Sequence, residues 1–166
     1  MLPLVKKILL VMAALLLAFV LMLYVALRTK ITDVTDKPPY AQFIGQPLVL
    51  KRPASISKSY EPNVQANPYL LQDAQVQADQ DAGPQYALPA GSVITLQQAK
   101  LFKNGTSGFE RSYVLGTAFV PELNAKVAFE YAWGKNNVSF TGNEKDHYTF
   151  PLALWQDRVI DGKFNY

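Results

Sequence analysis

Residues 8–27 read ILLVMAALLLAFVLMLYVAL, an apolar stretch with no charged residue, no proline and no glycine. An α-helix rises ~1.5 Å per residue, so a helix of this length matches the hydrocarbon layer of a bilayer, which is about 30 Å thick. The stretch therefore predicts a single transmembrane helix over residues 8–27.

The residues before the apolar stretch form a short tail that carries Lys6 and Lys7. A cleaved signal peptide would have a shorter apolar core, followed by a small-x-small cleavage site. The bulky Tyr24 stands where the first small residue before Ala26 is needed. This favours an uncleaved anchor over a signal peptide.

The flanking charges leave the orientation of the anchor nearly balanced. Arg28, Lys30 and Lys37 follow the helix and offset the two lysines before it, so the positive-inside rule does not decide. A seven-residue tail before a long domain is the usual layout of a signal anchor. We therefore expect residues 1–7 in the cytoplasm and the C-terminal domain on the non-cytoplasmic side, which for a bacterial inner membrane is the periplasm.

The charge of the chain is concentrated beside the membrane. The net charge is +3, but four of the 16 basic residues lie in the flanks of the anchor. Residues 31–166 hold the other twelve basic residues and all 13 acidic ones, a net charge of −1. This balance predicts no nucleic-acid partner. The absence of cysteine excludes disulfides, thiolate metal sites and cysteine nucleophiles.

Beyond the anchor the sequence predicts a stalk and one domain. Residues 28–42 contain Pro38 and Pro39 and little apolar periodicity, which is typical of a stalk. The domain is expected over residues 43–166, with an irregular insertion near residues 53–87.

The insertion itself has two parts. Residues 53–68 contain three prolines and predict an irregular connection. Residues 69–83 are rich in glutamine, alanine and aspartate and end at Gly83. They are compatible with a helical turn or two, or with a loop, and both interpretations stay open.

The rest of the domain alternates between short strands and turns. Asn104 and Gly105 form a strong hairpin signal, because both residue types accept positive φ angles. The expected strands cover residues 48–52, 93–102, 109–120, 126–133, 138–141 and 148–155. Pro151 makes the last of them an edge strand. Such spacing predicts a mainly β domain, a small antiparallel barrel or sandwich.

Residues 45–134 resemble the SH3-like barrel domains of bacterial envelope proteins. The resembling features are GQPLVL at 45–50, LPAGSVI at 88–94, the hairpin at Asn104 and Gly105, and the two long strands after it. The resemblance implies a small antiparallel SH3-like barrel. The acidic-aromatic peptide-binding motif of eukaryotic SH3 domains is absent, so the resemblance implies neither proline-peptide recognition nor any catalytic residue.

The nucleophilic and metal-ligating residue types form no recognised pattern. His147 is the single histidine and lies in a polar turn. Asp79 and Asp81 begin like an EF-hand loop, but position 90, where the closing glutamate belongs, is alanine. Ser107 and Ser112 lack the glycine frame of a nucleophile elbow.

Glu110 and Glu130 could meet across strands as the two carboxylates of an envelope hydrolase. A solvated sheet face is the simpler interpretation of both residues. We expect no catalytic residue, no metal site and no cofactor.

The aromatic residues are concentrated from Phe109 onward, and most are expected to fill the core. Tyr131, Trp133 and Trp155 are the residues expected to contact a partner, with Trp155 the favoured exposed anchor. The main hypothesis is a non-enzymatic single-pass membrane protein whose domain binds a protein, as an accessory subunit of secretion, pilus or motility machinery. The alternatives are a membrane-tethered periplasmic immunity protein against a toxin, an envelope hydrolase, and a lipid- or cell-wall-binding module.

Overall fold

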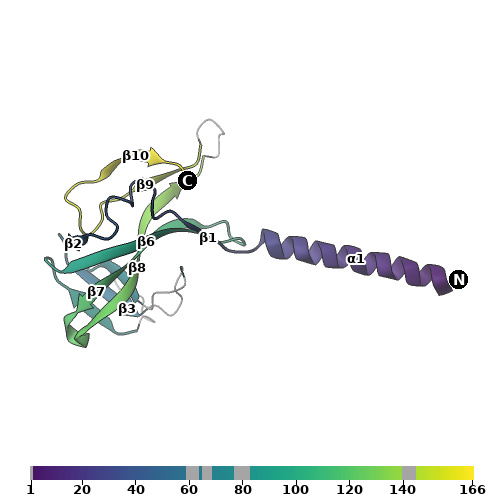
Figure 1. The fold of residues 1–166 in the computed structure, drawn as a ribbon, viewed down its shortest axis with the longest axis horizontal. Helices are drawn as coiled ribbons and strands as arrows, with labels where there is room; N and C mark the ends of the chain where they lie inside the picture. The colour runs from purple at the N-terminus through teal and green to yellow at the C-terminus, as the bar shows by residue number, and fades with distance from the viewer. Residues whose placement is uncertain (1, 59–63, 65–68, 77–82, 140–144) are drawn as a thin grey trace. The chain divides into compact units, whose positions relative to one another are not determined.

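The computed structural model describes residues 2–58, 64, 69–76, 83–139 and 145–166 as one long helix and a β-rich domain (Figure 1). The chain divides into two compact units, residues 1–30 with 103–109, and residues 31–102 with 110–166. The domain is mainly β, as the sequence predicts.

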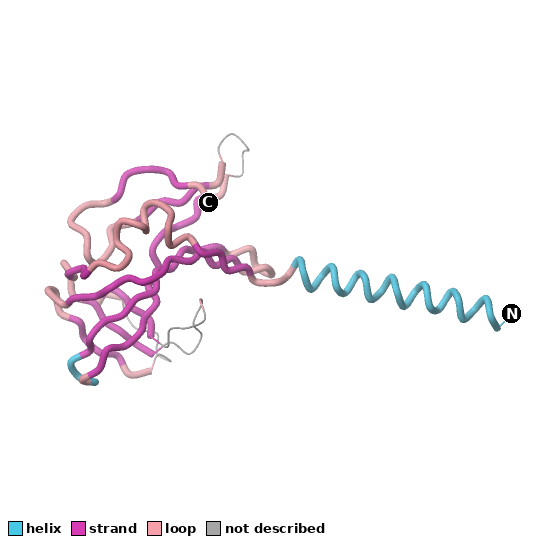
Figure 2. Tube along the Cα trace, in the orientation of Figure 1, coloured by secondary structure: helices cyan, strands magenta, loops and turns pink. Residues whose placement is uncertain are grey.

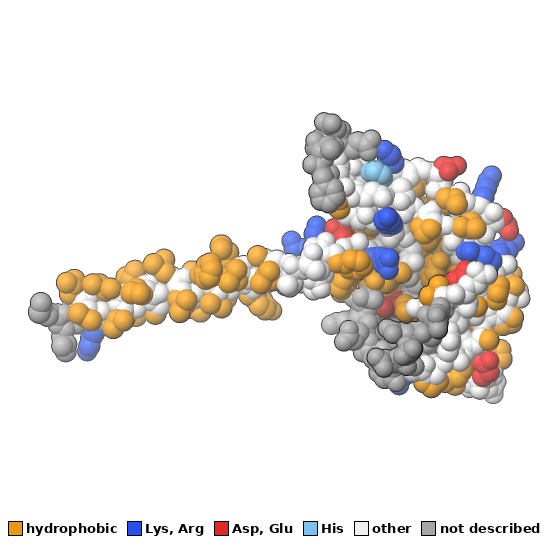
Figure 3. Space-filling model, turned by 180° about the vertical axis from the view of Figure 1, so that it is seen from behind, with side chains coloured by type: hydrophobic (Ala, Val, Ile, Leu, Met, Phe, Trp, Pro, Cys, Tyr) orange, Lys and Arg blue, Asp and Glu red, His pale blue; other side chains and the backbone are white. Residues whose placement is uncertain are grey.

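Helix α1 (Leu2–Ala26) contains all of the apolar stretch except Leu27 and begins six residues before it. Residues 3–26 form a helix that is long and apolar enough to cross a membrane, and Figure 3 shows hydrophobic side chains along it. The expected N-terminal apolar helix is confirmed by length and composition. The short tail is helical in the structure, because none of its residues after Pro3 interrupts the helical hydrogen bonds.

The first unit also contains the tip of the predicted hairpin. The Asn104 side-chain oxygen accepts hydrogen bonds from the backbone N–H groups of Thr106 and Ser107, both at 2.9 Å. The backbone N–H of Asn104 donates to the carbonyl of Phe109 at 2.8 Å. Asn104 therefore closes the turn through its own side chain.

Ten strands form one sheet in the described part of the chain (Figure 2). They are β1 (Lys30–Asp33), β2 (Pro47–Val49), β3 (Ala54–Lys58), β4 (Tyr69–Asp73), β5 (Gln85–Leu88), β6 (Val93–Lys103), β7 (Glu110–Val120), β8 (Ala125–Asn137), β9 (His147–Phe150) and β10 (Ile160–Phe164). A short 3₁₀ helix, η1 (Pro121–Leu123), connects β7 to β8. The sheet follows the order β1-β6-β7-β8-β4-β3-β5, with β2 also on β6, β9 on β8, and β10 on β9.

The long strand β8 carries two different partners along one edge. Its residues Phe129 and Glu130 pair in parallel with Tyr69 and Leu70 of β4. Farther along, Lys135–Asn137 pairs antiparallel with β9. The sheet therefore branches at β8.

The expectation of an SH3-like barrel is corrected here, because the branched sheet does not close into a barrel. Strands β1 and β5 stand at opposite ends of the order, and no pairing joins them among the described residues. The parallel pairing of β4 with β8 also departs from an all-antiparallel arrangement.

Residues expected outside the domain contribute to its core. Residues 28–42 are predicted as a stalk, yet they contain β1, and Val34 and Tyr40 are fully buried. The backbone N–H of Val34 donates to the carbonyl of Ala99 at 2.9 Å, which joins this segment to β6. Burial of these side chains draws the segment onto the sheet.

The irregular insertion is also corrected. Residues 53–68 contain β3, and residues 69–83 contain the strand β4 where a helical turn or a loop is expected. The two strands pair antiparallel along their whole length, from Ala54 against Asp73 to Lys58 against Tyr69. The long-range pairing, which the local sequence does not reveal, selects the strand.

The C-terminal strands begin and end differently from the prediction. Strand β8 continues to Asn137, and the expected strand at 138–141 lies partly outside the described residues. Strand β9 stops at Phe150, before Pro151, and β10 follows as a strand that the sequence does not predict. Proline ends β9 because it has no backbone N–H to donate to the ladder.

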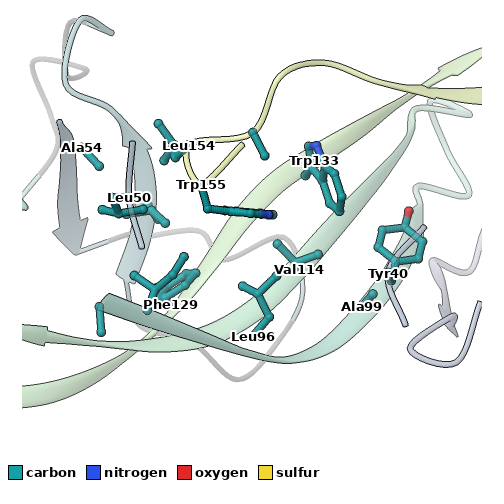
Figure 4. Packing of buried hydrophobic residues seen from close by; sticks show 14 of the residues in the cluster. Tyr40, Leu50, Ala54, Leu96, Ala99, Val114, Phe129, Trp133, Leu154 and Trp155 are labelled. Atoms are coloured by element: carbon teal, nitrogen blue, oxygen red, sulfur yellow. The ribbon is translucent and has the colours of Figure 1, made fainter. Parts of the chain in front are cut away.

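The main core lies on the inner face of the sheet and is rich in aromatic rings (Figure 4). Trp133 contacts Tyr40, Phe150 and Trp155, with ring centroids 4.9–5.8 Å apart and edge-to-face geometry. This arrangement is favoured by the ring quadrupoles. A second, smaller cluster of Val64, Tyr113 and Leu115 lies apart from it.

Candidate functional site

Tyr131, Trp133 and Trp155, which are expected to bind a partner, lie together in the structure. Most of their side-chain surface is buried inside the domain. The ring centroids of Trp133 and Trp155 are 5.2 Å apart, and those of Tyr131 and Trp155 are 5.5 Å apart. Trp133 is 0% exposed, and its indole N–H donates to the carbonyl of Pro151 at 3.0 Å. Trp133 is therefore a core residue that a partner cannot touch in this conformation.

Trp155 is the residue of the three that borders a large surface hollow formed by described residues of the domain. It is 6% exposed, so the expectation that Trp155 is an exposed anchor is wrong, because Tyr131, Trp133 and Phe43 pack around its ring. The small exposed part of its side chain lines a surface hollow of about 770 Å³. The wall is formed by Gln42, Phe43, Trp155, Gln156, Asp157, Arg158, Val159, Ile160 and Asp161. Two segments far apart in the chain, around residues 42 and 155–161, therefore form it.

A second hollow adjoins the first. It measures about 310 Å³ and is lined by Asp36, Pro38, Pro39, Ala41, Gln42, Ile160 and Phe164. Gln42 and Ile160 belong to both walls. We call the two hollows together the Trp155 groove.

The first wall of the groove is a series of turns that follows β1. Backbone N–H groups of Lys37, Tyr40 and Phe43 donate to carbonyls three residues back, at 2.8–3.0 Å. The Tyr40 hydroxyl is hydrogen-bonded to the hydroxyl of Ser112 on β7, inside the core. Burial raises the pKa of Tyr40 to about 12, so its hydroxyl stays protonated at neutral pH.

The second wall is the turn between β9 and β10. The side-chain oxygen of Gln156 accepts a hydrogen bond from the backbone N–H of Ala153 at 2.9 Å, and its own backbone N–H donates to the carbonyl of Ala153 at 3.1 Å. Gln156 is buried, so these bonds fix the turn that places Trp155. The indole N–H of Trp155 is buried and has no hydrogen-bond partner among the described residues.

The two walls are connected at the C-terminal end of the chain. The Tyr166 hydroxyl donates to the carbonyl of Pro38 at 2.5 Å, and the Tyr166 ring lies 5.8 Å from that of Tyr40. Burial and the neighbouring Tyr40 raise the pKa of Tyr166, which keeps this donor protonated. The hydrogen bond therefore holds β10 and the first wall together.

The groove combines apolar walls with a charged border. Its ionisable residues are Asp36, Asp157, Asp161 and Arg158. Asp157 forms an exposed ion pair with Lys51 at 3.3 Å, and Asp36 forms one with Lys37 at 3.6 Å. Asp161 forms no ion pair within the described ranges.

Tyr131 lines a different cleft, where β4 separates from β8. The parallel pairing of the two strands stops at Leu70 and Glu130, and beyond this point lies a cleft of about 310 Å³. Its polar border includes Arg111 and Asp73, and Asp73 pairs with Arg52 at 3.3 Å. Burial raises the pKa of the half-buried Tyr131, so the cleft presents a neutral phenol.

The two carboxylates considered for hydrolysis are engaged in separate structural roles. The Glu110 side chain accepts a hydrogen bond from the Tyr148 hydroxyl at 2.5 Å. Glu130 is 0% exposed and accepts a hydrogen bond from the backbone N–H of Val64 at 3.1 Å. The expectation that Glu130 lies on a solvated face is wrong, because Val64 covers that face.

The remaining chemical candidates have local roles where the structure describes them. His147 lies beside the carbonyl of Lys145, and Ser112 is bonded to Tyr40. The EF-hand-like pair Asp79 and Asp81 lies outside the described residues. Among the described residues, no three His, Cys, Asp or Glu side chains group as metal ligands.

Comparisons with known proteins found no matching family model, no similar curated protein and no similar solved structure. The candidate site therefore rests on the geometry of this chain alone. The sequence indicates Trp155, but it gives no signal for Phe43, Ile160 or Asp161. These residues meet only because residues 34–43 fold onto the sheet.

Proposed function

We propose that this chain is a single-pass protein of a bacterial inner membrane whose β domain binds a protein partner in the periplasm. The observation that supports this proposal is the Trp155 groove, a surface hollow with largely apolar walls and charged residues at its border. Pockets of this kind, with aromatic walls and a few polar groups, are the usual sites of recognition.

The anchor supports the same proposal. Helix α1 is long and apolar enough to span a bilayer, so it would keep the domain at the membrane surface. Within this proposal we favour an accessory subunit of an envelope complex, in which the groove contacts another subunit. A periplasmic immunity protein would use the same groove against a secreted toxin.

The proposal is tested by isolating partners of the full chain from membranes. Val159 in the groove and Phe119 outside it are both about half exposed, at 50% and 53%. We expect Val159→Arg to remove a stoichiometric partner from the purified complex, and Phe119→Arg to retain it. Equal recovery of the partner by both variants would overturn the groove as the binding site.

The identity of the recovered partner separates the two roles. A membrane-complex component supports the subunit role, and a secreted toxin supports the immunity role. A reporter fused after Tyr166 tests the orientation, and cytoplasmic activity of that reporter would overturn the periplasmic placement.

A further inference from the structure

We propose that the Trp155 groove binds an extended protein segment that carries both apolar and basic side chains. This inference rests on the proposed function and specifies the chemistry of the partner at the groove.

The shape of the groove suits an extended segment. Its two hollows, of about 770 and 310 Å³, meet at Gln42 and Ile160. In an extended chain every second side chain points to the same side. Two apolar side chains from one face of such a segment can therefore enter the two adjoining hollows.

The walls determine what kind of side chain can enter. Phe43, Trp155 and Ile160 line the larger hollow, and Pro39 and Phe164 line the smaller one. Burying apolar surface against them yields about 25 cal/mol for each Å² removed from water. The walls therefore favour aliphatic or aromatic side chains.

Asp161 gives the border of the groove a place for a positive charge, since it has no ion-pair partner among the described residues. The other two border carboxylates, Asp36 and Asp157, pair with Lys37 and Lys51, and Arg158 also lines the larger hollow. The lysine pairs of these two aspartates are exposed, with 79% and 78% of the Asp36 and Asp157 side chains accessible. Exposed ion pairs of this kind contribute little free energy, so a cation on the ligand can compete for these carboxylates.

A lysine or arginine has a second source of stabilisation in the groove. The half-buried ring of Phe43 lines the same hollow as Asp157, whereas Trp155 is buried against other rings. A cation near an exposed ring face such as that of Phe43 is attracted by the ring quadrupole. Charge complementarity of this kind contributes more to specificity and association rate than to total affinity.

The test uses the full chain in nanodiscs of zwitterionic lipid and three synthetic heptapeptides. The first alternates leucine and valine with lysine and arginine, the second replaces the basic residues with glutamate, and the third replaces the apolar residues with serine. We expect the first peptide to bind at least tenfold more tightly than either of the others, measured by fluorescence anisotropy. Equal affinity for the basic and acidic peptides would overturn the inference.

Matched variants connect the binding to the groove. We expect the double variant D157N/D161N to weaken the first peptide about tenfold and to reduce the salt dependence of binding. Glu122→Gln removes a charge on η1 that lines neither hollow, so this control variant should bind as the wild type does. An unchanged affinity of D157N/D161N would overturn the inference.

The two proposals fail in different ways. If Val159→Arg removes the native partner while all three peptides bind alike, the groove is a protein-binding site but its partner is not basic. If Val159→Arg leaves the native partner bound, the proposed function fails at this site whatever the peptides do.

Discussion

The hydroxyl of Tyr40 is hydrogen-bonded to the hydroxyl of Ser112, which lies 72 residues later in the chain, and both residues are fully buried. This bond holds the first wall of the Trp155 groove against β7. The groove therefore depends on a contact between the segment that contains Tyr40 and strand β7 of the sheet.

Loss of this hydrogen bond should destabilise the domain. We expect Tyr40→Phe to lower the free energy of unfolding by about 1–3 kcal/mol, because Ser112 would keep a buried hydroxyl without its partner. Denaturant unfolding followed by circular dichroism measures the change. Tyr86→Phe is the control, since the half-buried Tyr86 hydroxyl makes no hydrogen bond with a described residue. Equal effects of the two variants would contradict the role of the Tyr40–Ser112 bond.

The raised pKa of Tyr40 makes stability depend on alkaline pH. The unfolded chain loses tyrosine protons near pH 10, whereas folded Tyr40 keeps its proton up to a pKa of about 12. Its contribution is therefore complete below pH 10 and is lost as the pH rises through 12. We expect stability to fall by at most about 1.4 kcal/mol per pH unit for this group, and less steeply in Tyr40→Phe. Identical slopes for wild type and variant between pH 10 and 12 would rule out this contribution.

The two tryptophans of the core should respond differently to removal of the indole N–H. Trp133 donates to the Pro151 carbonyl at 3.0 Å, whereas the buried Trp155 N–H has no partner among the described residues. Both changes to phenylalanine lose ring volume, but only Trp133→Phe leaves a carbonyl without its donor. We expect Trp133→Phe to cost about 1–3 kcal/mol more than Trp155→Phe in denaturant unfolding. A larger cost for Trp155→Phe would show that the hydrogen bonds are assigned incorrectly.

Gly116 on β7 marks a close approach of two strands. A Cβ atom there would lie 2.5 Å from the backbone oxygen of Thr95, which cannot move without separating β6 from β7. We expect Gly116→Ala to lower the melting temperature by several degrees, in keeping with a cost of about 1–3 kcal/mol. The neighbouring Thr117→Ala should change it little, since the buried Thr117 hydroxyl has no partner in the described residues. A Gly116→Ala protein as stable as the wild type would contradict this packing.

The anchor can be tested by placing a charge at its centre. We expect Leu16→Arg to reduce the fraction of protein that resists carbonate extraction from membranes, because arginine at a helix centre costs about 2.5–3.5 kcal/mol of insertion energy. Leu16→Ile keeps the stretch apolar and should remain in the membrane pellet. Equal extraction of the two variants would show that α1 does not span the bilayer.

The sequence reveals the parts of the fold whose signals are local. The apolar run predicts α1, and the side chain of Asn104 predicts the hairpin that joins β6 and β7. By contrast, β1 (KITD) has all four residues exposed and β3 (ASISK) contains two serines. Neither segment therefore stands out in the sequence as a run of apolar, strand-forming residues. Their strand conformation comes from pairing with partners distant in the chain.

The candidate site is predictable only in part, for the same reason. Trp155 stands out in the sequence as a large ring near the C-terminus, and it does line the groove. Both tryptophans are buried, but Trp133 is 0% exposed and lines no part of the groove, because β9 and the Tyr40 segment cover its face of β8. The other wall of the groove lies in a proline-containing segment that resembles a stalk, and no local feature shows that it folds back.

The most direct test of the groove as a partner-binding site is site-specific photo-crosslinking in living cells. A photoreactive amino acid replaces Val159 in the groove or Phe119 outside it, two side chains of similar exposure. We expect the full chain to form one dominant crosslinked protein species from position 159 and none from position 119. The same species from both positions, or from 119 alone, would contradict the central claim that the Trp155 groove is where this membrane-anchored domain binds its partner.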